Sequence, residues 1–66
     1  MPQIIVNGQP KDVPSGTTIA QLITLHQLTP DKVAVELNRR LVRAPAYGTV
    51  LKENDEVELV TFVGGG

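Results

Sequence analysis

Apolar and polar residues alternate, or short β-branched runs occur, over most of this chain, and one segment follows helical spacing instead. The β-branched run at residues 3–6 predicts a strand, and Asn7 and Gly8 supply the two residues that a tight hairpin turn needs at positive φ. Residues 9–13 would return as the second strand, with Pro10 near its start, where a missing N–H is tolerated. We therefore expect the chain to open with a β-hairpin.

Helical spacing begins at Ile19, from which apolar residues recur at positions i, i+3 and i+4. This pattern predicts a helix over residues 19–28, and Thr17 or Thr18 can cap its first turn. His26 falls on the same apolar stripe. We interpret it as a neutral, half-buried histidine near the helix end and not as a ligand, because no second histidine and no cysteine lies nearby in the sequence.

A second hairpin is predicted in the middle of the chain. Residues 33–38 alternate and place three apolar side chains on one face, as a half-buried strand does. Residues 41–43 would pair with this strand across a turn. Arg39 occupies that turn, where glycine is the preferred residue, so the sequence leaves the register of the turn open.

Two connecting segments carry turn residues. Residues 29–32 predict a turn or a single helical turn, because proline is favoured at the first helical position. Residues 44–51 predict a loop that holds a short helical turn and places Tyr47 or Val50 on the core. Both segments link elements that would pack together.

The longest strand is predicted at residues 56–63, after turn chemistry in which Asn54 tolerates a left-handed conformation. Its core face would carry Val57, Leu59, Thr61 and Val63. Its other face would carry Glu56, Glu58, Val60 and Phe62. This face would be solvated at the start of the strand and apolar near its end. The order of elements predicts an α+β domain in which one helix covers one face of a sheet.

Composition narrows the possible functions. A chain of 66 residues forms one small domain, which can hardly enclose a deep substrate pocket. It has no cysteine, which excludes a disulfide, a thiolate metal site and a cysteine nucleophile. A net charge of −1 and only two aromatic residues argue against nucleic acid, and no apolar run is long enough to cross a membrane. We expect a soluble, cytoplasmic protein that binds no metal or cofactor and has no catalytic residues of its own.

Three glycines, Gly64, Gly65 and Gly66, follow the last predicted strand. We expect residues 1–63 to form the domain and residues 64–66 a flexible tail. A chain without Cβ atoms can enter a narrow slot, and the Gly66 carboxylate would be ionised at neutral pH. Such a carboxylate can attack ATP and then, as an adenylate, accept a sulfur nucleophile. The alternative is a frayed tail without function, since termini are commonly disordered.

Two sets of exposed residues are candidate partner contacts. Val60 and Phe62 form an apolar strand end beside the tail. Arg39, Arg40 and Arg43 form a basic cluster on the central hairpin, which is either a solvated turn or an electrostatic contact with acidic groups of a partner.

Three segments, residues 33–38, 53–57 and 60–66, resemble the sulfur carrier family of thiamine biosynthesis (ThiS), which belongs to the ubiquitin-like β-grasp superfamily. The resemblance covers essentially the whole chain and is most specific at the diglycine ending. It implies a mixed sheet of four or five strands packed on one helix. The sequence departs from the family pattern at Arg39, where a small turn residue is usual, and at His26, where an apolar residue is.

The resemblance also implies a role as a protein cosubstrate and not as an enzyme. An E1-like enzyme would adenylate Gly66 with Mg-ATP, and a sulfur donor such as a cysteine desulfurase system would convert it to a thiocarboxylate that supplies thiazole synthase. Gly64 and Gly65 would provide the reach. Three alternatives stay open: a related carrier for molybdopterin synthesis, a carrier for tRNA thiolation, or a binding module without terminal chemistry.

Overall fold

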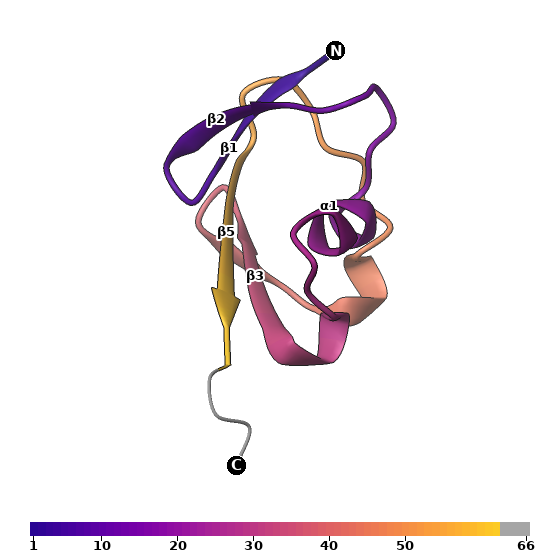
Figure 1. Cartoon of the computed structure of the whole chain (residues 1–66), viewed down its shortest axis with the longest axis vertical. Helices are drawn as coiled ribbons and strands as arrows, with labels where there is room; N and C mark the ends of the chain where they lie inside the picture. The colour runs from indigo at the N-terminus through magenta and orange to yellow at the C-terminus, as the bar shows by residue number, and fades with distance from the viewer. Residues whose placement is uncertain (63–66) are drawn as a thin grey trace.

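The computed structural model describes residues 1–62 and shows one helix lying across a five-stranded mixed sheet (Figure 1). The strands lie in the order β2-β1-β5-β3-β4, and only the central pair β1 and β5 is parallel. In chain order the elements are β1 (Gln3–Val6), β2 (Gln9–Asp12), α1 (Ile19–Leu25), the 3₁₀ turn η1 (Pro30–Lys32), β3 (Val33–Leu37), β4 (Arg40–Val42), the 3₁₀ turn η2 (Ala44–Ala46) and β5 (Glu56–Thr61). The predicted α+β arrangement is confirmed, with five strands.

The first hairpin forms as predicted. Asn7 and Gly8 both have positive φ, 49° and 81°, which matches the twist of the flanking strands. The pairing runs from Val6 opposite Gln9 to Gln3 opposite Asp12. The second strand therefore ends one residue earlier than predicted.

Helix α1 begins where the sequence indicates but ends sooner. Thr18 caps it: the Thr18 hydroxyl accepts from the Gln21 amide, and the Gln21 side chain accepts from the Thr18 amide. The helix stops at Leu25 and not at residue 28, because Gln27 takes φ of 60° and turns the chain out of the helix. Propensity along residues 19–28 does not reveal this left-handed residue.

His26 follows α1 as its cap residue and is half-buried, as predicted. Its ring atom Nδ1 lies 3.0 Å from the carbonyl oxygen of Leu22, one helical turn earlier. Leu28, beyond the helix, still packs against the core, and its amide donates to the Ile23 carbonyl at 3.1 Å. The apolar stripe thus continues past the last helical residue.

The middle hairpin forms with a register that the sequence left open. Asn38 and Arg39 have φ of 52° and 71°, so both turn residues are left-handed although neither is glycine. Leu37 pairs with Arg40, and β4 spans residues 40–42 and not 41–43. The turn is thus a two-residue turn of the same kind as that at Asn7 and Gly8.

The core lies between α1 and the face of the sheet that α1 covers. Its fully buried side chains come from every layer and include Ile4, Ile19, Leu22, Ile23, Leu51, Val13, Val35 and Val57. Tyr47, which follows η2, closes one end at 8% exposure, whereas Val50 is 47% exposed. Of the two predicted loop contacts, Tyr47 is therefore the correct one. Within residues 1–62 no helix is long enough to cross a membrane.

Candidate functional site

The strand that leads toward the glycines is the central strand of the sheet (Figure 1). β5 pairs in parallel with β1 near its start, at Glu56 and Val57, and in antiparallel with β3 from Val57 to Thr61. Val57 and Leu59 point into the core and are almost fully buried. A segment that follows β5 is therefore joined to a strand that is paired within the sheet and anchored in the core.

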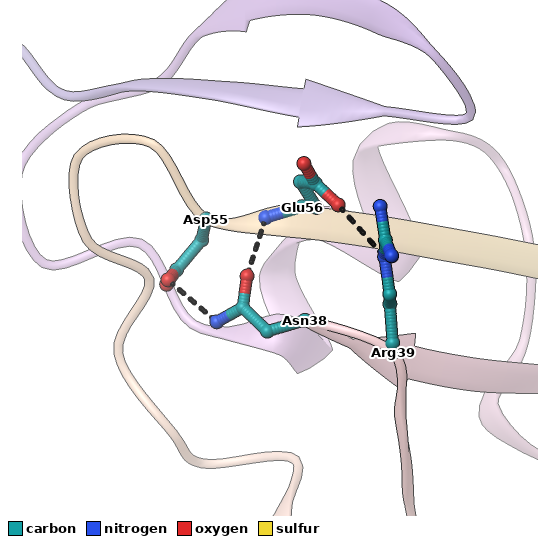
Figure 2. A network of polar contacts seen from close by, with 4 residues as sticks. All are labelled: Asn38, Arg39, Asp55 and Glu56. Atoms are coloured by element: carbon teal, nitrogen blue, oxygen red, sulfur yellow. Dashed lines mark hydrogen bonds and ion pairs between the residues drawn. The ribbon is translucent and has the colours of Figure 1, made fainter.

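A polar network holds the start of β5 (Figure 2). The Asn38 side chain accepts from the Glu56 amide at 2.9 Å and donates to the Asp55 carboxylate at 3.1 Å. The other oxygen of Asp55, a residue only 7% exposed, accepts from the Lys52 amide at 2.8 Å. These bonds join the middle hairpin to the turn before β5. The sequence suggested turn chemistry at both places but not that the two turns touch, because the residues are 17 positions apart.

Asn7 holds the opposite flank of β5. Its side-chain oxygen accepts from the Leu59 amide at 2.7 Å, and its side-chain nitrogen donates to the Leu59 carbonyl at 3.2 Å. The side-chain amide of Asn7 thereby bonds to Leu59 as a backbone residue of β1 would, at the point where β1 turns away into β2. The sequence identified Asn7 only as a turn residue, since a contact 52 positions away leaves no local signal.

The end of β5 carries exposed apolar side chains. Val60 is 54% exposed and Phe62 is 59% exposed, as the sequence predicted for this face. We call Val60 and Phe62 the tail-side patch. Leu41 on β4, also 59% exposed, lies on the same face of the sheet because it pairs with Glu36, which pairs with Glu58. Leu41 was missed because its exposure depends on a sheet face that α1 leaves uncovered.

The three arginines occupy different positions on the middle hairpin. The Arg39 Nε lies 3.7 Å from a carboxylate oxygen of Glu56 (Figure 2), and this pair is too exposed to contribute much stability. Arg40 lies opposite Leu37, on the face toward the helix, and Arg43 precedes η2. All three are exposed, but the structure distributes them around the hairpin.

Carboxylates dominate the middle of the uncovered face. Glu36 on β3 lies directly opposite Glu58 on β5, and Glu56 follows on the same face. Like charges directly opposite are unfavourable, and among residues 1–62 Arg39 forms its ion pair with Glu56 and not with Glu36 or Glu58. Beside the tail-side patch this face is therefore acidic; the sequence placed Glu56 and Glu58 on it but did not reveal that Glu36 lies opposite Glu58.

Among residues 1–62 no group of three or more potential ligands is placed to hold a metal ion. A shallow hollow of about 600 Å³ lies beside α1, between Pro14 and Leu25, and a smaller one of about 300 Å³ lies over Glu36 and Glu58. Neither includes Val60 or Phe62 in its lining. The described part of the chain thus offers a docking surface at the end of β5 and no enclosed site there.

The predicted reactive segment itself lies outside the described residues. This applies to Val63, predicted as the end of the last strand, and to Gly64, Gly65 and Gly66. The division at residue 63 and the roles of the three glycines therefore stay predictions.

Comparison with known proteins identifies the family. The ThiS family matches residues 4–66. A crystal structure of the thiamine biosynthesis protein ThiS from Geobacter metallireducens superposes with a TM-score of 0.79 at 31% identity, over 97% of this chain and 99% of that one. A solution structure of a thiamine biosynthesis protein from the same organism gives a TM-score of 0.77 at 31% identity, over 97% of this chain and 87% of that one.

Two longer relatives carry a similar segment. The thiazole synthase of Magnetococcus marinus is 43% identical over 65 residues, and that of Paramagnetospirillum magneticum is 31% identical over 65 residues. Each match covers 97% of this chain, which spans only 20% of the length of either relative. With the family match over residues 4–66 and the shared fold, these relatives show that the chain belongs to the ThiS family, the ubiquitin-like β-grasp sulfur carriers of thiamine biosynthesis.

Proposed function

We propose that this chain is a protein cosubstrate whose Gly66 carboxylate is adenylated and converted to a thiocarboxylate, which donates sulfur for thiazole formation. The observation that carries the proposal is the position of β5. The strand is held on both sides at its start, it ends in an exposed apolar patch, and the three glycines follow it in the sequence. The family match, which extends to residue 66, supports the same assignment.

The chemistry requires two displacements. An oxygen of the ionised Gly66 carboxylate attacks the α-phosphorus of ATP, and pyrophosphate leaves with the electron pair of the broken P–O bond. A sulfur nucleophile at the oxidation level of sulfide then attacks the carbonyl carbon. The C–O bond to AMP breaks, AMP leaves, one proton is released, and the carboxylate has exchanged one oxygen for sulfur. Mg-ATP would be bound by an E1-like enzyme.

Chain length limits where that enzyme can lie. Four residues follow Phe62, and a segment of four residues spans at most about 14 Å. An enzyme that reacts with Gly66 must therefore place its active site within about 14 Å of Phe62, the residue that follows β5. Its surface would meet the tail-side patch, whose apolar side chains are exposed and suited to burial in a complex.

Three partners follow from this chemistry. An E1-like adenylating enzyme would activate Gly66, and a donor such as a cysteine desulfurase system would provide sulfur, with a thiol reductant that brings its persulfide sulfur to the oxidation level of sulfide. The third is thiazole synthase, and a similar segment within two polypeptides named thiazole synthase supports this partner. The exposed arginines, Arg39, Arg40 and Arg43, would raise the association rate with an acidic partner surface more than the affinity.

Intact-mass spectrometry tests the proposal. The protein, ending at Gly66, is incubated with the adenylating enzyme, Mg-ATP and hydrosulfide. We expect the mass of the intact protein to increase by the difference between one sulfur atom and one oxygen atom. A matched variant with one residue added after Gly66 should show no such increase, because the glycine carboxylate is then an amide. Thiolation of the extended variant would show that another group carries the sulfur.

A further inference from the structure

We propose that the enzyme that adenylates Gly66 adds an extended segment of its own chain to the open edge of β5 at Thr61. Main-chain hydrogen bonds to the Thr61 N–H and C=O would hold this segment. The inference rests on the proposed function, since it names the surface by which that enzyme binds the strand that precedes the glycines.

The flank of β5 toward β1 is closed only as far as Leu59. The Ile5 amide donates to the Asp55 carbonyl at 2.9 Å, and the Asn7 amide donates to the Val57 carbonyl at 2.9 Å. At Leu59 the partner is already a side chain, because the Asn7 amide group makes both hydrogen bonds. Odd-numbered residues of β5 thus direct their backbone groups toward β1.

Even-numbered residues bond toward β3 instead. The Asn38 amide donates to the Glu56 carbonyl at 2.7 Å, and the Phe62 amide donates to the Lys32 carbonyl at 3.1 Å. By this alternation the N–H and C=O of Thr61 point to the flank that β1 has left. Within residues 1–62 the structure gives Thr61 no main-chain partner on that flank.

The vacant flank has a simple origin in the chain path. β1 runs parallel to β5 but pairs with it only as far as Val6 opposite Val57, after which Asn7 and Gly8 turn the chain into β2. β5 therefore extends beyond the first hairpin (Figure 1). A partner strand placed at Thr61 would continue the line of β1 and extend the sheet, which is a known mode of peptide recognition.

Location favours this edge over the two outer edges of the sheet. The outer strand β2 carries Pro10, and the outer strand β4 has only three residues, features that discourage strand addition. Thr61 lies next to the tail-side patch and within about 18 Å of the Gly66 carboxylate along an extended chain. The adenylating enzyme must approach to that distance, so an extended segment of it is the occupant that we infer.

The variant Thr61→Pro isolates the proposed bond. Proline removes the Thr61 N–H, which faces the vacant flank, and spares the bonds to β3, which come from even-numbered residues. The residue before a proline favours an extended backbone, which Val60 already has in β5. Thr61→Val is the matched control, because it keeps the N–H and the β-branched shape while removing the hydroxyl.

We expect the KM of the adenylating enzyme to be about three- to tenfold higher for Thr61→Pro than for wild type, which corresponds to the loss of one hydrogen bond. The KM for Thr61→Val should equal the wild-type value. Equal KM values for the two variants would overturn the inference, as would an effect seen only in the affinity for thiazole synthase. Wild-type protein that is not thiolated at all would instead refute the proposed function.

A second variant guards against a folding defect. Chemical synthesis can replace the amide N–H of residue 61 by an ester oxygen, which leaves the side chain and the chain geometry in place. Thermal unfolding shows whether each variant is folded. If the ester variant is folded and binds the adenylating enzyme as tightly as wild type, the Thr61 edge takes no added strand.

Discussion

The two ends of β5 differ although they belong to one strand of six residues. At its start the strand lies between β1 and β3, and the side chains of Asn38 and Asp55 bond to the turn that precedes it. At its end β3 alone flanks it within residues 1–62, and Val60 and Phe62 are more than half exposed. The first end provides stability, and the second presents a surface.

This difference shows how a small domain separates folding from recognition. Burying a core and exposing an apolar patch have opposite effects on the free energy of folding in water, and 66 residues leave little stability to spare. Closing the start of β5 with exposed and partly buried polar bonds and with core side chains permits the other end to stay open. Substitutions at the two ends should therefore affect different measurements.

Asn38→Ala should have the largest effect. It removes the side-chain hydrogen bonds to Asp55 and to the Glu56 amide. It also places alanine at φ of 52°, a left-handed conformation that asparagine tolerates better because its side chain can form local hydrogen bonds. We expect the free energy of unfolding to fall by about 2 kcal/mol, measured by urea denaturation. An unchanged denaturation midpoint would mean that the network contributes nothing.

Asn38→Gly serves as its control. Glycine loses the same side-chain bonds but accepts positive φ freely, so its loss of stability should be smaller, about 1 kcal/mol. The difference between the two variants measures the cost of a Cβ at this positive φ, and a loss of stability in the glycine variant is a lower bound on the contribution of the network. Both folded variants should bind the adenylating enzyme with wild-type affinity.

Val60→Asp should leave stability nearly unchanged and weaken binding. Val60 is 54% exposed in the tail-side patch, and a buried carboxylate in a complex would lack a partner. We expect the Kd for the adenylating enzyme, measured by calorimetry, to rise about tenfold or more. Val50→Asp is the matched control, because Val50 is 47% exposed but lies opposite Thr18 in an isolated bridge. Equal losses of affinity in both variants would rule out a specific role for the patch.

Arg39→Gly should have the smallest effect. Arg39 has φ of 71°, a conformation that glycine adopts without cost, and its ion pair with Glu56 is exposed. We expect stability to rise by up to about 1 kcal/mol in urea denaturation. A loss of stability that high salt abolishes would show that the pair to Glu56 matters more than the strain of the turn.

Local chemistry made much of this fold predictable. As turn and cap residues, Asn7, Gly8, Thr18 and Asn54 act through their own backbone or that of a near neighbour, so their positions in the sequence suffice for the turns and the cap. The end of α1 was predicted three residues too late, because the left-handed turn at Gln27 carries no glycine to mark it.

The candidate site was only half predictable. Val60 and Phe62 follow from alternation along one strand, whereas Leu41 joins their face only through pairing across three strands. The basic cluster was predicted from neighbours in sequence, and the structure places its members at different parts of the hairpin: Arg39 in the turn, Arg40 on β4 and Arg43 after β4.

The sequence by itself determined the order of elements, the core-facing residues and the family, because these follow from periodicity, turn residues and the ending of the chain. The tertiary structure decided that Asn38 bonds to Asp55, that Asn7 closes one flank of β5 at Leu59, and that the next position of that flank is open. These features depend on groups that are far apart in sequence, and only the folded path of the chain sets the distance between them.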